Sequence, residues 1–142
     1  MSNFVAFMKG NKKRRPNEFY AATKSLTDEN GVPLRWELRP VTTRENEVIR
    51  DLCTTEVQVP GKPGMYRQRV DTSAYQVKLM TAAVVTPNLN DKELQDSYGV
   101  LSAEELLKEM LDDAGEYTDL AIKVQQMSGF TTLAEDVETV KN

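Results

Sequence analysis

Few residues of this chain could take part in chemistry, and together they form no complete reactive set. The sequence has no histidine and one cysteine, Cys53, so it lacks Ser/His and Cys/His nucleophile pairs and the most common general base. The segment PGKPG at residues 60–64 has the composition of a phosphate-binding loop, but not the G-x-x-x-x-G-K-[ST] spacing. Its two prolines also lack amide donors, so we expect a plain turn there. These features favour a function other than catalysis.

An acidic cluster in the C-terminal third is the other candidate for chemistry. It comprises Asp112, Asp113, Glu116 and Asp119. The cluster lacks the D-x-[DN]-x-[DN]-G pattern and the twelfth-position glutamate of a calcium loop. Acidic side chains near the start of a helix explain it more simply, since they interact favourably with the helix dipole. We therefore expect no metal site, no cofactor site and no catalytic carboxylate pair.

A basic run at residues 12–15, Lys-Lys-Arg-Arg, could bind RNA or an acidic protein surface. Phe19 and Tyr20 follow it and could stack on bases. The run is short and lies outside any expected helix or strand, which is typical of a solvated linker. A solvated linker is thus the favoured interpretation, protein contact the second, and nucleic-acid binding the third.

The composition is that of one soluble globular domain. The chain has 142 residues, of which 39% are hydrophobic and 28% charged. Its apolar runs, such as residues 4–8 and 82–85, are too short to span a membrane, and the basic residues near the N-terminus follow the apolar ones, so we expect no secretory signal. A lone cysteine fits a reducing cytoplasm. The net charge is +4 for residues 1–50, −1 for 51–100 and −7 for 101–142.

The N-terminal half is expected to contain two hairpins and two helices. A short helix at residues 3–9 places Phe4, Phe7 and Met8 on one side, which needs either the body of the domain or a partner to dock on. A hairpin follows over residues 18–40, with its turn at 28–31. A Thr42/Glu45 capping box then opens a helix, and a second hairpin is expected at residues 56–59 and 66–70. The apolar face of that helix is expected to comprise Val48, Ile49, Leu52 and Cys53.

The C-terminal half is expected to be helical. Helices are predicted at residues 72–84 (capped by Asp71), 91–98, 103–111, 116–128 and from about 132 onward. The fold class is therefore α+β, with a small antiparallel hairpin region in the N-terminal half and a helical C-terminal half. One domain over residues 1–142 is divided into an N-terminal helix and basic linker (1–15), a hairpin-rich part (16–70) and a helical part (71–142).

The apolar stripes of the last helices are the candidate partner-binding residues. They are Leu106, Met110, Tyr117, Leu120, Val124, Leu133, Val137 and Val140. For the first five, packing in the core is the favoured alternative, since such stripes more often face the interior. For the last three, docking on the domain and docking on a partner are about equally favoured, because the final stripe is narrow.

One block of the sequence is specific enough to indicate a family. It runs from residue 87 to residue 107 and contains Asn90-Asp91 and the run Leu94-Gln95-Asp96-Ser97-Tyr98-Gly99. Individually weaker segments extend it over most of the chain: residues 4–13, 34–40, 59–62, 115–117, 129–130 and 141–142. Together they resemble the tail assembly chaperones of long-tailed bacteriophages, in particular those of contractile-tailed phages and phage-derived tail elements of Gram-positive hosts.

The resemblance implies a non-enzymatic protein that binds the long helical tape measure protein and keeps it soluble until tail-tube subunits polymerise around it. It implies action in the cytoplasm of the bacterial host and absence from the mature virion. The major tail tube protein and a second copy of the chain are further partners to consider, whereas membrane and nucleic acid are not expected. The resemblance supplies no catalytic or ligand residues. Two other interpretations stay open: a tail-completion or connector subunit of the virion, and a small RNA-binding regulator.

Overall fold

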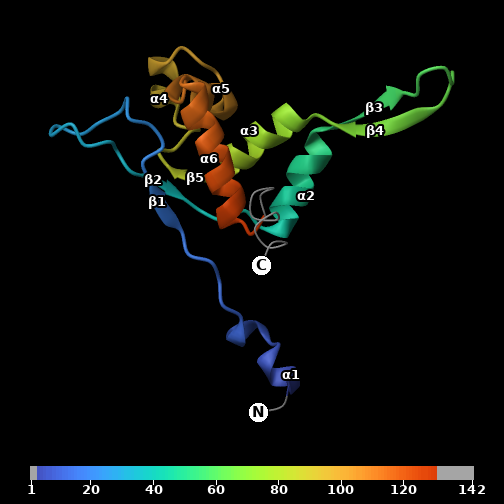
Figure 1. Cartoon of the computed structure of the whole chain (residues 1–142), viewed down its shortest axis with the longest axis horizontal. Helices are drawn as coiled ribbons and strands as arrows, with labels where there is room; N and C mark the ends of the chain where they lie inside the picture. The colour runs from blue at the N-terminus through green and yellow to red at the C-terminus, as the bar shows by residue number, and fades with distance from the viewer. Residues whose placement is uncertain (1–2, 131–142) are drawn as a thin grey trace, which may run out of the picture.

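The computed structural model describes residues 3–130 and combines helices with two small antiparallel sheets, so the α+β prediction is confirmed (Figure 1). The elements are α1 (Asn3–Ala6), the 3-10 helix η1 (Lys9–Asn11), β1 (Glu18–Tyr20), β2 (Trp36–Leu38), α2 (Thr43–Leu52), β3 (Thr54–Gln58), β4 (Tyr66–Val70), α3 (Thr72–Ala83), β5 (Val84–Thr86), α4 (Lys92–Ser97), α5 (Ala103–Met110) and α6 (Ala114–Met127).

The first sheet has three strands in the order β1-β2-β5. The predicted hairpin forms, because β1 and β2 pair in antiparallel register from Glu18↔Leu38 to Tyr20↔Trp36. Its strands are shorter than predicted, and most of the segment between them is a loop. Gly31 lies in its turn at φ 78°, a left-handed conformation that glycine adopts without steric cost.

The third strand of this sheet, β5, is a correction to the sequence prediction. Val84 is predicted to end the preceding helix, but it begins β5 and pairs with Leu38 of β2. Two features favour the extended backbone here: Val84-Val85-Thr86 is a run of β-branched residues, and Thr86 precedes a proline. Backbone groups that would have formed hydrogen bonds within a longer helix pair instead with β2 at the edge of the sheet.

Helix α3 is the centre of the core. It packs against α2, α5 and α6, and its side chains Val77, Leu79, Met80 and Ala83 are buried. Ala74, Tyr75 and Ala82 lie outside this face and are also partly buried against the core, so α3 has no wide polar face, which is typical of a helix enclosed on several sides. Trp36, 2% exposed, closes the core from the sheet side, as predicted from its place in an alternating strand.

The second sheet is a two-stranded ribbon that stands apart from the first (Figure 1). Strands β3 and β4 pair over five positions from Thr54↔Val70 to Gln58↔Tyr66, so the second predicted hairpin is confirmed. Most of its residues are exposed, and residues 59–65 form its turn rather than a phosphate site.

The helix starts follow the predicted caps closely. The hydroxyl of Thr42 accepts from the Glu45 amide while the Glu45 carboxylate accepts from the Thr42 amide, which completes the capping box. Asp71 caps α3, as predicted, and Ser102 caps α5, which begins at the predicted residue 103. Two boundaries differ: α4 begins at Lys92 after the Asp91 cap, one residue later than predicted, and α6 begins at Ala114, two residues before the predicted Glu116.

Candidate partner-binding groove

Most of the predicted partner-binding side chains lie in the core. Leu106 and Leu120 are completely buried, Val124 is 1% exposed and Met110 is 6% exposed. A side chain buried to this extent cannot contact a partner in this conformation, so the structure gives these four residues a role in packing α5 and α6 against α3. Tyr117 is partly buried against the same core, and this burial raises the pKa of its phenol.

The remaining predicted residues, Leu133, Val137 and Val140, lie outside the described residues, as does the predicted helix from about residue 132. The basic linker at residues 12–15 has no helix or strand and is exposed. The predicted helix at residues 3–9 forms only partly, as α1 followed by single turns with hydrogen bonds from Phe7 N to Phe4 O and from Met8 N to Val5 O.

A groove of about 440 Å³ lies between α2, α3 and the segment that leads into α5. Ile49 and Leu52 line it from α2, Ala82 from α3, and Leu101 from the chain before α5. Glu104 also lines the groove; its Oε1 lies 3.3 Å from Nζ of Lys78 on the opposite helix. The groove therefore combines apolar walls with a charged pair, the composition of a site for an amphipathic segment.

Two leucines of the groove are exposed to an unusual degree. Leu101 is 91% exposed and Leu52 is 68% exposed. Leu101 faces solvent, whereas its neighbour Val100 is buried at 8% exposure. Gly99, at φ 70°, reverses the chain just before this pair.

The exposure of Leu52 corrects the predicted apolar face of α2. Ile49 and Cys53 face the core, but Val48 and Leu52 face solvent at 55% and 68% exposure. Each pair is four residues apart, so each forms its own stripe on the helix surface. The four apolar residues thus form two faces: one packs in the core, and the other presents Leu52 to the groove. Cys53 is a buried free thiol, as predicted.

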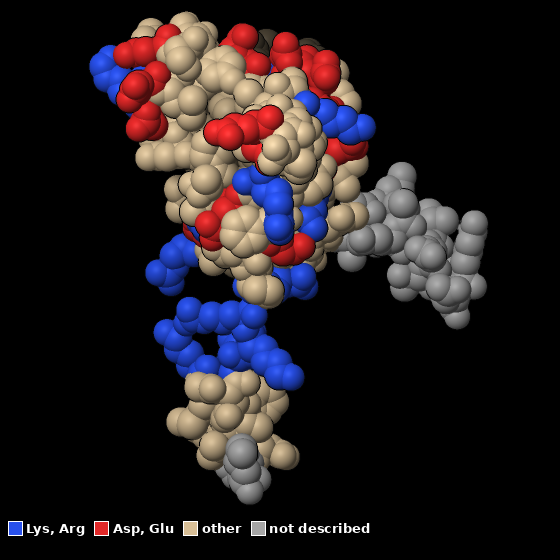
Figure 2. Space-filling view, turned by 90° about the vertical axis from the view of Figure 1, so that its left-hand side faces the viewer, with Lys and Arg blue, Asp and Glu red and all other residues tan. Residues whose placement is uncertain are grey.

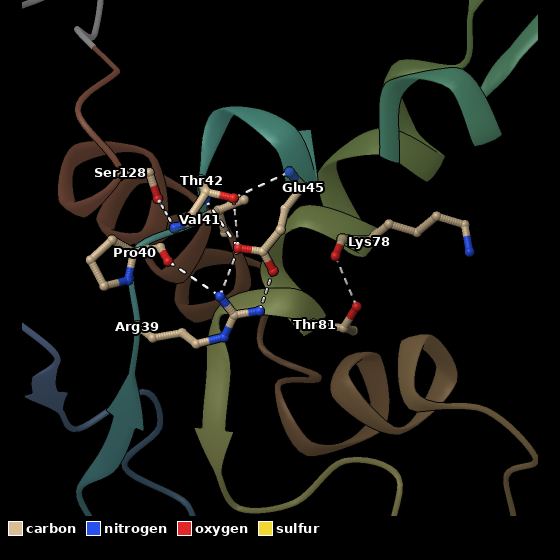
Figure 3. Close-up of polar contacts among 8 residues, drawn as sticks. All are labelled: Arg39, Pro40, Val41, Thr42, Glu45, Lys78, Thr81 and Ser128. Carbon is tan, nitrogen blue, oxygen red and sulfur yellow. Dashed lines mark hydrogen bonds and ion pairs between the residues drawn. The ribbon is translucent and has the colours of Figure 1, made fainter. Parts of the chain in front are cut away.

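A polar cluster fixes α2 in the position that forms the groove (Figure 3). Arg39, just after β2, donates from Nη1 and Nη2 of its guanidinium to the two carboxylate oxygens of Glu45, at 2.9 and 2.5 Å. The Val41 amide donates to Oγ of Ser128 at the end of α6, at 2.8 Å. The first turn of α2 is thereby tied both to the sheet and to the last described helix.

The same cluster sets the protonation of its charged groups. Hydrogen bonds from Arg39 are the largest cause that lowers the pKa of Glu45 from 4.5 to about 2, and the Thr42 amide and hydroxyl add to this effect. The hydrogen bond to Glu45 in turn raises the pKa of Arg39. The side chains of Arg39, Thr42, Glu45 and Ser128 each form hydrogen bonds within this cluster, so its geometry holds α2 in place.

Part of the acidic cluster has a structural role at the start of α6. Glu116 accepts from the Thr23 hydroxyl at 2.7 Å and from the Lys24 amide at 2.8 Å. These hydrogen bonds, that from Thr23 first, lower the pKa of Glu116. They hold the loop after β1 on α6. Within residues 3–130, no group of three or more His, Cys, Asp or Glu side chains is arranged to hold a metal ion.

The N-terminal arm, defined here as residues 3–15, is the second exposed apolar feature. It extends away from the folded body, at the end opposite α4 and α5 (Figure 1). Phe4, Phe7 and Met8 are 75%, 86% and 52% exposed. None of the helices in the described part of the chain has both the length and the apolar character needed to cross a bilayer.

The fold is that of a small α+β protein with an exposed groove, and comparison with known proteins places it among phage tail assembly chaperones. The family described as phage XkdN-like tail assembly chaperone protein matches residues 4–141, so the chain belongs to that family. The predicted family is thereby confirmed. This membership indicates a non-enzymatic role in tail assembly.

Two relatives come from Bacillus subtilis (strain 168). The phage-like element PBSX protein XkdN is 24% identical over 116 residues, which cover 82% of this chain and 77% of the relative. The uncharacterized protein YqbN is 25% identical over 116 residues, covering 82% and 76%. The crystal structure of the protein YqbN superposes with a TM-score of 0.76 at 20% identity, covering 92% of this chain and 99% of that one. The fold is therefore shared with YqbN.

The groove residues Leu52 and Leu101 were missed as partner-binding candidates. A signal for Leu101 was present: two apolar residues stand between a helix-ending glycine and the Ser102 cap, and only one can face the body. For Leu52, spacing alone did not distinguish one apolar face from two adjacent ones. That distinction depends on which neighbouring helices α2 meets.

Proposed function

We propose that this protein binds the tape measure protein of its phage tail and keeps it soluble until the tail tube polymerises. The observation that carries the proposal is the family match over residues 4–141. A long helical protein with exposed apolar stripes aggregates unless those stripes are covered. Acting as a chaperone, the protein would work in the host cytoplasm and leave before the virion is complete.

The groove between α2, α3 and the start of α5 is the proposed client site. Leu52 and Leu101 would contact the apolar face of a client helix, as exposed leucines do in helix-in-groove recognition. Lys78 and Glu104 line the same groove and would pair with charged residues beside that face. Four predicted partner-binding residues, Leu106, Met110, Leu120 and Val124, are already used in the core, which makes this groove the better candidate among the described residues.

Co-expression with the cognate tape measure protein tests the proposal. We expect the native chain to raise the soluble fraction of the tape measure, and Leu52→Asp combined with Leu101→Asp to abolish this effect. Met65→Asp is the matched control, because Met65 is a 54% exposed apolar residue in the turn of the β3–β4 ribbon. If the tape measure is equally insoluble with and without the native chain, the proposed function is wrong.

Mass spectrometry of purified particles addresses the chaperone role separately. We expect the tape measure protein in mature particles and this chain to be absent from them. Recovery of the chain in stoichiometric amount would instead favour a connector subunit.

A further inference from the structure

We propose that the N-terminal arm of one copy docks in the groove of a second copy. The arm has the character of a docking segment. Its three large apolar side chains lie at positions 4, 7 and 8, a spacing that places them on one helical face, and all three are mostly exposed. A helix as short as α1 does not persist alone in water, so its order calls for a surface that covers this face.

The arm also has a single sign of charge. It carries Lys9, Lys12, Lys13, Arg14 and Arg15. The first acidic residue of the chain is Glu18, the first residue of β1. Figure 2 shows these basic side chains as a continuous band between the apolar tip of the arm and the body. A docking site for this arm should therefore combine an apolar hollow with nearby carboxylates.

The groove offers both features at the acidic end of the body. Leu52 and Leu101 supply exposed apolar surface, and Glu104, which pairs with Lys78, lines the same groove. The carboxylate of Glu105 lies beside Leu101, whose amide donates to its Oε2 at 3.3 Å. Figure 2 shows acidic side chains gathered over the end of the body that bears α4 and α5. The apolar tip and basic band of the arm thus match this end in both hydrophobicity and charge.

The position of the arm favours a second copy over the arm's own body. Its root lies beside the end of α6, where the Arg15 guanidinium approaches Gly129. From this root the arm leads away from the end that bears α4 and α5 (Figure 1). The apolar tip is thereby presented to a neighbouring molecule. Both proposals use the same groove, but this self-association requires no client and is tested without one, so its failure would leave the proposed function untouched.

Analytical ultracentrifugation of the full-length chain without client tests the proposal. We expect concentration-dependent self-association over about 1–100 μM, a range typical of modest interfaces. Phe4→Ser with Phe7→Ser should weaken it at least about 100-fold, since loss of each aromatic anchor commonly costs roughly tenfold or more. Leu52→Asp with Leu101→Asp should weaken it similarly, and Met65→Asp should leave it unchanged. Circular dichroism should show all variants folded, because every replaced side chain is exposed.

Mixing the two defective variants gives the decisive result. The arm variant keeps an intact groove, and the groove variant keeps an intact arm, so together they should form a 1:1 complex that neither forms alone. A native chain that stays monomeric over this range would overturn the proposal. Self-association that survives the arm variant, or variants that do not complement each other, would overturn it as well.

Discussion

Replacement of Glu45 by Gln is expected to destabilise the protein at neutral pH and to have little effect in strong acid. The Glu45 carboxylate accepts hydrogen bonds from two nitrogens of the Arg39 guanidinium and from the amide of Thr42, the N-cap of α2. Glutamine keeps one oxygen that can accept the cap hydrogen bond, but it loses the charge that pairs with Arg39. The substitution therefore removes mainly the ion pair with Arg39 and leaves the cap hydrogen bond largely intact.

The magnitude follows from the pKa of Glu45. Its decrease from 4.5 to about 2 would correspond to about 3.4 kcal/mol if the pair were fully shielded, at about 1.4 kcal/mol per pKa unit. The side chains of Arg39 and Glu45 are 36% and 34% exposed, so solvent screens much of this interaction. We therefore expect Glu45→Gln to reduce the free energy of unfolding by about 1–2 kcal/mol at pH 7.

The pH dependence has a definite sign. The pKa of Glu45 is lower in the folded state than in the unfolded state, so the stabilisation is complete above about pH 4.5. It is lost as the pH falls from about 4.5 toward about 2, because protonation then removes the charge that pairs with Arg39. The native chain and the Glu45→Gln variant should accordingly converge in stability near the acidic end of this range.

Urea unfolding at several pH values measures this difference. The matched control is Asp96→Asn, which removes an exposed pair: Lys92 and Asp96 lie 3.5 Å apart, with side chains 87% and 59% exposed. We expect the control to cost no more than about 0.5 kcal/mol at any pH. An equal cost for Glu45→Gln at pH 7 and at about pH 3 would refute the reasoning. So would a cost at pH 7 no larger than that of the control.

Five further substitutions test other parts of the structure by urea unfolding. Gly99→Ala should cost about 1–2 kcal/mol, because φ 70° strains any residue with a Cβ, whereas Gly115→Ala, without positive φ, should be neutral or stabilising. Leu106→Ala should cost about 2–5 kcal/mol, since this completely buried side chain would leave a cavity. Leu52→Asp and Leu101→Asp should each change stability by less than about 0.5 kcal/mol, because both side chains are exposed; a larger loss would place them in the core.

Local signals predicted much of the fold because they act within a few residues. The Thr42/Glu45 pair, Asp71 and Ser102 each satisfy backbone amides of the turn that follows them, so the sequence alone locates α2, α3 and α5. Glycines at 99 and 129 end helices for the same local reason, and both have positive φ.

Features set by distant contacts could not be predicted in this way. Strand β5 forms because Val84 pairs with Leu38 of β2, and the residues around Val84 do not indicate that it will pair with that strand. The groove likewise depends on α2 meeting α3 beside the start of α5, which turns Leu52 outward while Ile49 and Cys53 face inward. The stripes on α5 and α6 were correctly identified as apolar faces, but periodicity does not tell core from partner surface.

The burial of Cys53 has a practical consequence for following tail assembly. The thiol is 4% exposed, so soluble maleimide dyes should react slowly with it in the folded chain. A cysteine introduced at position 65, in the turn of the β3–β4 ribbon, would then carry a fluorophore selectively while the native thiol stays in place. Fluorescence from that single label could report when the chain binds and releases a partner.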